Sequence, residues 1–131
     1  MIVLDASAAI EWILRTEAGG AIARRILSSG GSLHAPHLVD LEVASALRKH
    51  VALHGLIPRR AQEALQDFLR LNLRRYPHAP LLPRVWELRA NLTAYDAAYV
   101  ALAEALGATL LTCDGKIAAA AGHRAKVEVV E

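Results

Sequence analysis

Two aspartates stand at the ends of apolar runs that the sequence predicts to be strands. Asp5 directly follows Ile2–Leu4, and Asp114 closely follows Ala108–Thr112. If both runs belong to a parallel sheet, their carboxyl ends meet at one edge, where open α/β sheets bind their ligands. The spacing therefore predicts that these two carboxylates lie close together although they are far apart in sequence.

Two further acids are predicted to join them. Asp96 lies in the first turn of an apolar helical run, Glu42 lies near the start of another, and Lys116 is the only cation close in sequence. Two unit charges about 4 Å apart repel by roughly 4 kcal/mol at an effective dielectric constant near 20. Such a cluster raises the pKa of its members or binds a cation. Carboxylates suit Mg²⁺ or Mn²⁺, which activate water and stabilise charge on phosphoryl groups.

Each acid also has an ordinary structural interpretation. Thr93 and Asp96 match a helix capping box, and Asp5 and Asp114 each precede a residue run that can begin a helix. Asp40 lies two residues from Glu42 and is an equal candidate by position. Spacing alone leaves helix capping and metal binding open.

Two hydroxyl groups flank the predicted site. Ser7 follows Asp5 by two residues, and Thr112 precedes Asp114 by two residues. Side chains behind a metal site orient its ligands by hydrogen bonds. We predict this supporting role for both hydroxyls.

The hydrophobic pattern predicts how these residues are positioned. Short apolar strands alternate with helices, which is typical of an α/β sandwich with a parallel sheet covered on both faces. With 131 residues, we predict a single domain spanning 1–131. The predicted strands are Ile2–Leu4, Leu33–Ala35, Ala108–Thr112 and Lys126–Val130, and the predicted helices are Ala6–Leu14, Ala18–Leu27, His37–Leu53, Arg59–Leu73, Val85–Ala90 and Thr93–Leu106.

The charge of the chain is uneven. Nine of the 15 Lys and Arg residues, against three acids, fall between Arg48 and Arg89, although the formal net charge is only +2. An excess of arginine suits contact with phosphates, and Arg70, Arg74 and Arg75 are the predicted phosphate contacts; a solvated helix face is the alternative. The single cysteine, the absence of a basic leader and the lack of a long uncharged apolar run predict a cytoplasmic protein with no membrane contact.

Three segments resemble the PIN-domain family, and specifically the VapC toxins of bacterial toxin–antitoxin pairs. They are MIVLDASAAIEW at the start, LEVASALRK in the middle and YDAAYVALAEALGATLLTCDGKIA near the end. The resemblance covers essentially the whole chain in the same order. It implies a PIN-like three-layer sandwich with a short central parallel sheet and helices on both faces.

The resemblance also implies an activity and partners. The acidic constellation of the family falls on Asp5, Glu42, Asp96 and Asp114, with Ser7 and Thr112 at its hydroxyl positions. The family hydrolyses RNA (tRNA, rRNA or mRNA) with Mg²⁺ or Mn²⁺ and an activated water, leaving a 3′-hydroxyl and a 5′-phosphate. A VapB-type antitoxin and a homodimer are the implied protein partners.

Two other function classes remain to be weighed. A catalytically silent PIN fold that binds nucleic acid or protein would be favoured by asparagine at the acid positions, and none is present there. An aspartate-nucleophile phosphatase needs an aspartate at the position of Ser7, and a phosphate-accepting receiver needs adjacent acids after its first strand. The sequence therefore favours the nuclease.

Overall fold

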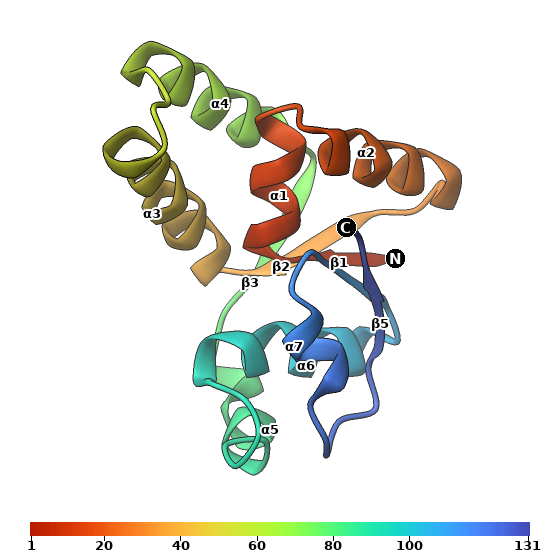
Figure 1. The fold of residues 1–131 in the computed structure, drawn as a ribbon. Coiled ribbons are helices and arrows are strands. Elements are labelled where there is room, and N and C mark those ends of the chain that lie inside the picture. Colours follow the sequence, from red (N-terminus) through yellow and green to blue (C-terminus); the bar gives the residue numbers. More distant parts are fainter.

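A five-stranded sheet forms the centre of the protein, which a computed structural model describes over residues 1–131 (Figure 1). Its order is β3-β2-β1-β4-β5, and every neighbouring pair is parallel. The chain therefore changes direction across the sheet between β1 and β4, which is where such sheets open a crevice. The strands are β1 (Ile2–Leu4), β2 (Leu33–Pro36), β3 (Leu73–Tyr76), β4 (Thr109–Thr112) and β5 (Lys126–Val129).

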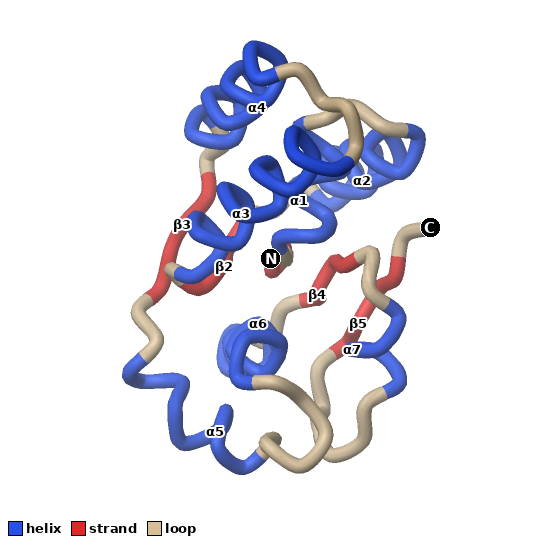
Figure 2. The backbone as a smooth tube through the Cα atoms, turned by 60° about the vertical axis from the view of Figure 1, so that its left-hand side comes forward, coloured by secondary structure: helices blue, strands red, loops and turns tan.

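Helices cover both faces of the sheet, so the three-layer prediction is confirmed (Figures 1 and 2). One layer contains α1 (Ala6–Ile13), α2 (Glu17–Ser29), α3 (Leu38–Leu53) and α4 (Pro58–Arg70). The other contains the 3₁₀ turn η1 (Ala79–Leu81), α5 (Leu82–Glu87), α6 (Ala94–Leu106) and α7 (Gly115–Ala119). None of these helices combines the length and hydropathy needed to cross a bilayer.

The core explains why the central elements are so apolar. Strand β1 is buried along its whole length, and Leu110 and Leu111 of β4 are fully buried. A parallel strand covered on both faces must be apolar on both sides. Helix α6 packs directly under the sheet, and its residues 97–103 are all buried, which its alanine content permits by allowing close approach (Figure 2).

Two elements differ from the sequence-based prediction, and the smaller difference is that the helix predicted at Val85–Ala90 lies at Leu82–Glu87. The predicted helix Arg59–Leu73 ends at Arg70, and Leu73–Tyr76 form the edge strand β3 beside β2. Leu73 is buried and pairs with Leu33, while Arg74 is exposed. The helical period of the preceding residues hid this short strand, because three of its four side chains are long and polar or aromatic.

Candidate active site

Asp5 and Asp114 lie side by side at the carboxyl ends of β1 and β4. The two strands pair directly, and the Asp5 amide donates to the carbonyl oxygen of Leu111 at 3.2 Å. Both aspartates are also helix caps: Asp5 Oδ1 accepts from the Ala8 amide at 3.0 Å, and Asp114 Oδ1 accepts from the Lys116 amide at 2.9 Å. The capping interpretation is therefore correct for both residues, and it places them at the crevice of the sheet.

Two hydroxyl groups hold Asp5 in place. Ser7 Oγ donates to Asp5 Oδ1 at 2.7 Å and accepts from the Cys113 amide at 3.0 Å. Thr112 Oγ1 donates to Asp5 Oδ2 and accepts from the Asp114 amide at 2.9 Å. Each hydroxyl thus connects the end of β1 to the end of β4. Because Asp5 is only 4% exposed, these donors fix the direction of its carboxylate.

Asp96 and Glu42 come from helices in opposite layers. Asp96 is half-buried in the first turn of α6, where its amide donates to the Thr93 hydroxyl at 3.2 Å. Glu42 is half-buried on α3, and its Oε1 accepts from the phenol of Tyr99 at 2.6 Å. Tyr99 follows Asp96 by three residues on α6, so one helix both carries one acid and holds the other.

The charges of Asp5, Glu42 and Asp96 act on one another, and the charge of Asp114 acts on Asp96. Burial raises the pKa of Asp5, although hydrogen bonds from Thr112, Ala8 and Ser7 lower it, and the charge of Asp96 raises it further. Burial likewise raises the pKa of Glu42, and Asp96 and Asp5 add to that increase. Burial and then the charge of Asp114 raise the pKa of Asp96.

No cation is paired with this cluster. All the salt bridges of the chain involve other acids, and Lys116 only partly lowers the pKa of Asp96. The donor set and its excess negative charge fit a hard divalent ion. No three His, Cys, Asp or Glu side chains lie in a group that could hold a metal ion as they stand. The fit therefore rests on donor type and charge.

Glu42 and its neighbour Asp40 have different partners in the structure. Asp40 pairs with Arg75, whose single Nε–H donates to both carboxylate oxygens, at 2.7 Å to Oδ1 and 2.9 Å to Oδ2. Glu42 instead accepts from Tyr99, and the charges of Asp96 and Asp5 contribute to raising its pKa. Asp40 fastens α3 to the edge strand, whereas Glu42 belongs to the acid cluster.

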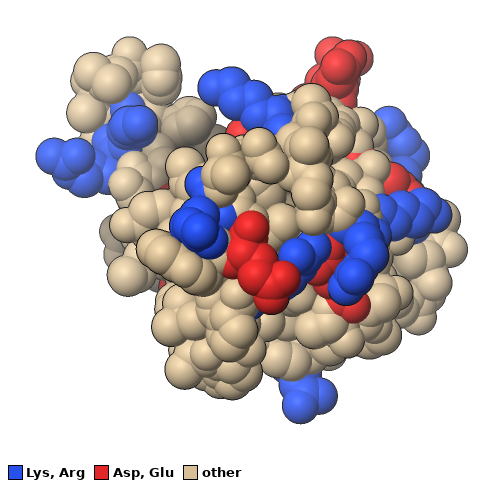
Figure 3. All heavy atoms as spheres, turned by 90° about the horizontal axis from the view of Figure 1, so that it is seen from below, with Lys and Arg blue, Asp and Glu red and all other residues tan.

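The three arginines singled out in the sequence do not line the groove between α1 and α3 that contains Glu42. Arg75 is held by Asp40, Arg70 lies 3.6 Å from Asp67, and Arg74 lies over the ring of Tyr76. On the face of the molecule below α5–α7, basic and acidic side chains alternate in small groups (Figure 3). The excess of arginine in the middle of the chain thus does not form one continuous basic field on this face.

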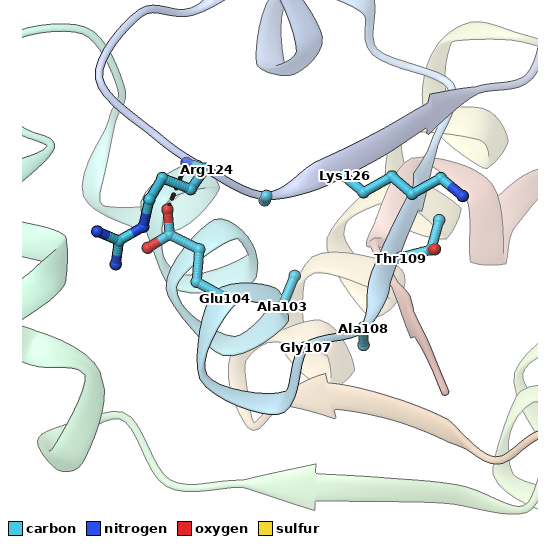
Figure 4. Close-up of a pocket in the computed structure, with 8 residues that line it drawn as sticks. Ala103, Glu104, Gly107, Ala108, Thr109, Arg124 and Lys126 are labelled. Atoms are coloured by element: carbon cyan, nitrogen blue, oxygen red, sulfur yellow. Dashed lines mark hydrogen bonds between the residues drawn. The ribbon is translucent and has the colours of Figure 1, made fainter.

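A second hollow lies at the opposite edge of the sheet. It measures about 310 Å³ and is lined by the start of β4, the start of β5 and the end of α6, including Thr109, Lys126 and Glu104 (Figure 4). Glu104 pairs with Arg84 at 2.7 Å and accepts from the Arg124 amide at 2.6 Å. The pKa of Glu104 is lowered by these partners. This hollow is a structural junction remote from the acids.

Tyr99 is the residue whose role sequence reasoning missed. A tyrosine in an apolar helical run is expected to be a core residue, and Tyr99 is 2% exposed. The available signal was its position three residues after Asp96, which places both side chains on one side of α6. The contact with Glu42 required knowledge of how α3 and α6 face each other.

The chain is similar to known proteins both in sequence and in structure. The sequence model described as "PIN domain" matches residues 2–123. The chain is 46% identical to "Ribonuclease VapC12" of Mycobacterium tuberculosis over 130 residues, covering 99% of each protein. The crystal structure of PAE2754 from Pyrobaculum aerophilum matches at a TM-score of 0.73 and 25% identity, over 98% of this chain and 83% of that one. VapBC2 from Rickettsia felis, bound to a DNA fragment from its promoter, matches at a TM-score of 0.73 and 18% identity over 100% of both chains.

Proposed function

Because this chain belongs to the PIN-domain family, as its motifs predicted, we propose that it is a metal-dependent endoribonuclease, the toxin of a toxin–antitoxin pair. The observation that carries the proposal is the absence of a paired cation around Asp5, Glu42 and Asp96, which raise one another's pKa values, with Asp114 acting on Asp96. The name of the 46% identical relative, a ribonuclease, gives the reaction class. The acid cluster supplies a place for that reaction.

We assign the four acids different roles in binding the metal ion. Asp5 and Asp96 are the proposed primary ligands of Mg²⁺ or Mn²⁺, with Asp114 and Glu42 completing the shell directly or through water. When bound, the ion would supply positive charge for the phosphoryl oxygens and activate water for attack. Ser7 and Thr112 keep the Asp5 carboxylate directed into the site by donating to both of its oxygens.

Glu42 is suited to handle the attacking water. Its Oε1 is occupied by the phenol of Tyr99, so Oε2 remains available to accept a proton. Burial and the neighbouring charges raise its pKa, and a raised pKa makes a carboxylate a stronger base. Attack by water, rather than by the ribose 2′-hydroxyl, leaves a 3′-hydroxyl and a 5′-phosphate.

The proposed partners follow from the family. A VapB-type antitoxin is supported by the structural similarity to VapBC2, a toxin–antitoxin complex by its name. We also propose a homodimer, which would place two acid clusters on one assembly. Arg70, Arg74 and Arg75 stay predicted RNA contacts, and Arg74 is the one of the three that pairs with no acid.

Cleavage of a total-RNA pool tests the activity. Native protein with Mg²⁺ or Mn²⁺ should give discrete cuts with 5′-phosphate ends, and chelator or Asp96→Asn should abolish them. Asp67→Asn is the matched control, because Asp67 lies outside the acid cluster and only pairs with Arg70. Folded, antitoxin-free protein that binds RNA without cutting it would instead indicate a binding module.

A further inference from the structure

A groove of about 430 Å³ lies between α1 and α3, and Glu42 is the one acid of the cluster that lines it. Ala6, Ser7 and Cys113 line its inner end beside Glu42, so the groove is continuous with the proposed active site. The two helices pack against each other on the same face of the sheet (Figures 1 and 2). An RNA strand that lies in this groove therefore contacts both α1 and α3.

The α3 wall of the groove changes character along its length. Glu42, Ser45 and Lys49 all line it, at positions i, i+3 and i+7 of one helix face. The wall thus passes from a carboxylate to a hydroxyl to an ammonium group. Seven residues correspond to about two helical turns, or roughly 10 Å along the axis.

The charge of Lys49 is available for a ligand. Lys49 is exposed and forms no salt bridge, whereas Arg25, Arg59, Arg70, Arg75 and Arg84 all pair with acids. An unpaired cation in a groove attracts anionic groups more strongly than one that is already neutralised. Lys49 is therefore the basic side chain best placed to continue the substrate path from the acids.

The facing wall is unfavourable to phosphate. Glu11 of α1 lines the groove opposite α3, and its carboxylate accepts from the Thr16 hydroxyl. A carboxylate repels phosphate but accepts from the amino groups of bases and from ribose hydroxyls. The α1 wall thus offers a phosphate no cation, whereas the α3 wall offers Lys49, which favours a strand whose backbone lies along α3.

We propose that this groove is a substrate subsite in which Lys49 binds an RNA phosphate, with the backbone along α3 and the bases toward α1. The proposal rests on the proposed ribonuclease activity and extends it by a binding residue and a strand orientation. Ser45 lies between Glu42 and Lys49 and donates its hydroxyl to the same backbone. A groove of about 430 Å³ holds a short stretch of one strand rather than a duplex, so the expected ligand is unpaired RNA.

Neutralising Lys49 tests the subsite in the full chain. Lys49→Gln should raise the KM for a short single-stranded RNA about threefold or more, leave kcat unchanged at saturating RNA, and reduce the salt slope of binding by about 0.7. Lys49→Arg should restore the native KM and salt slope. Arg48→Gln is the matched control: Arg48 neighbours Lys49 but lines the separate groove between α3 and α4, so its KM should stay near native.

The outcomes separate this subsite from the activity itself. Equal KM and salt slope for native protein and Lys49→Gln, with metal-dependent cleavage intact, would overturn the subsite and leave the nuclease standing. An equal loss for Arg48→Gln would also overturn it, because a diffuse positive field would then suffice. Binding that depends on Lys49 without any cleavage would support the groove and contradict the nuclease.

Discussion

The phenol of Tyr99 donates a hydrogen bond of 2.6 Å to Oε1 of Glu42 and thereby joins helix α6 to helix α3. The two helices lie in opposite layers of the sandwich, and each carries one acid of the cluster. Tyr99 is buried, and burial followed by the bond to Glu42 raises its pKa far above that of an ordinary tyrosine. The phenol therefore remains a donor throughout the physiological pH range and fixes one oxygen of Glu42.

Removing this hydroxyl should impair the site without unfolding the chain. We expect Tyr99→Phe to lower metal affinity or kcat by about 10- to 100-fold, as is typical when a group that orients a ligand is lost. Tyr76→Phe removes a different phenol, which bonds to His34 at 2.7 Å, and should keep both values near native. Mn²⁺ binding and RNA cleavage would be measured on both variants, and native values for Tyr99→Phe would contradict the positioning role.

The Thr112 hydroxyl should matter more to stability than its size suggests. Thr112→Val keeps the shape but leaves buried Asp5 without one donor, so the free energy of unfolding should fall by about 1–3 kcal/mol at neutral pH without metal. Thr109→Val on the same strand changes a half-buried hydroxyl away from the acids and should stay within about 0.5 kcal/mol of native. Equal losses in urea unfolding would show that strand β4 simply disfavours valine.

Stability should respond to pH and metal together. The folded-state pKa values of Asp5, Asp96 and Glu42 are raised above the ordinary 3.8 and 4.5, so between those values and the raised ones the folded chain holds extra protons. Their contribution to stability is full below the ordinary pKa and is lost as pH rises through the raised pKa. A divalent ion offsets this loss, by about 2.7 kcal/mol at a hundredfold excess over its Kd.

Thermal melting of metal-free protein, with and without added Mg²⁺, checks this prediction. The increase in Tm caused by Mg²⁺ should grow from acidic to neutral pH. The lowered pKa values of Glu104 and Glu128, which arise from hydrogen bonds to Arg84 and Arg25, affect both arms equally and cancel. A Tm that Mg²⁺ leaves unchanged at neutral pH would contradict a metal-binding cluster.

The two acids of α3 should behave oppositely. Glu42→Gln should abolish most RNA cleavage, because it removes a carboxylate from the cluster. Asp40→Asn should keep cleavage and lower stability modestly, because it breaks only the half-buried pair with Arg75. Comparing kcat and Tm for the pair tests the assignment, and the reverse pattern would transfer the active-site role to Asp40.

Much of the site could be predicted because strand ends and helix starts are visible in sequence. Asp5 and Asp114 follow apolar runs, so a parallel sheet brings them together, and Ser7 and Thr112 come with them. The family motifs also sufficed for the fold. Strand β3 was missed because an edge strand has one unpaired side and tolerates Arg74 and Arg75, which removes the apolar signal.

Side-chain contacts between residues far apart in sequence could not be predicted either. Arg75 could be recognised as basic, but its pairing with Asp40 depends on how β3 lies against α3. The same holds for the bond between Tyr99 and Glu42, which are 57 residues apart. Composition gives the number of charges, whereas the packing of the layers decides which are neutralised and which remain for a ligand.

Direct Mn²⁺ binding, followed by electron paramagnetic resonance, tests the central claim that the four carboxylates hold a divalent ion. At neutral pH the native chain should bind Mn²⁺, Asp96→Asn should bind it much more weakly, and Asp67→Asn should match the native chain. Mg²⁺ should compete for the same site. Native protein that leaves Mn²⁺ free at millimolar concentration, or Asp96→Asn that binds as well as native, would contradict the account.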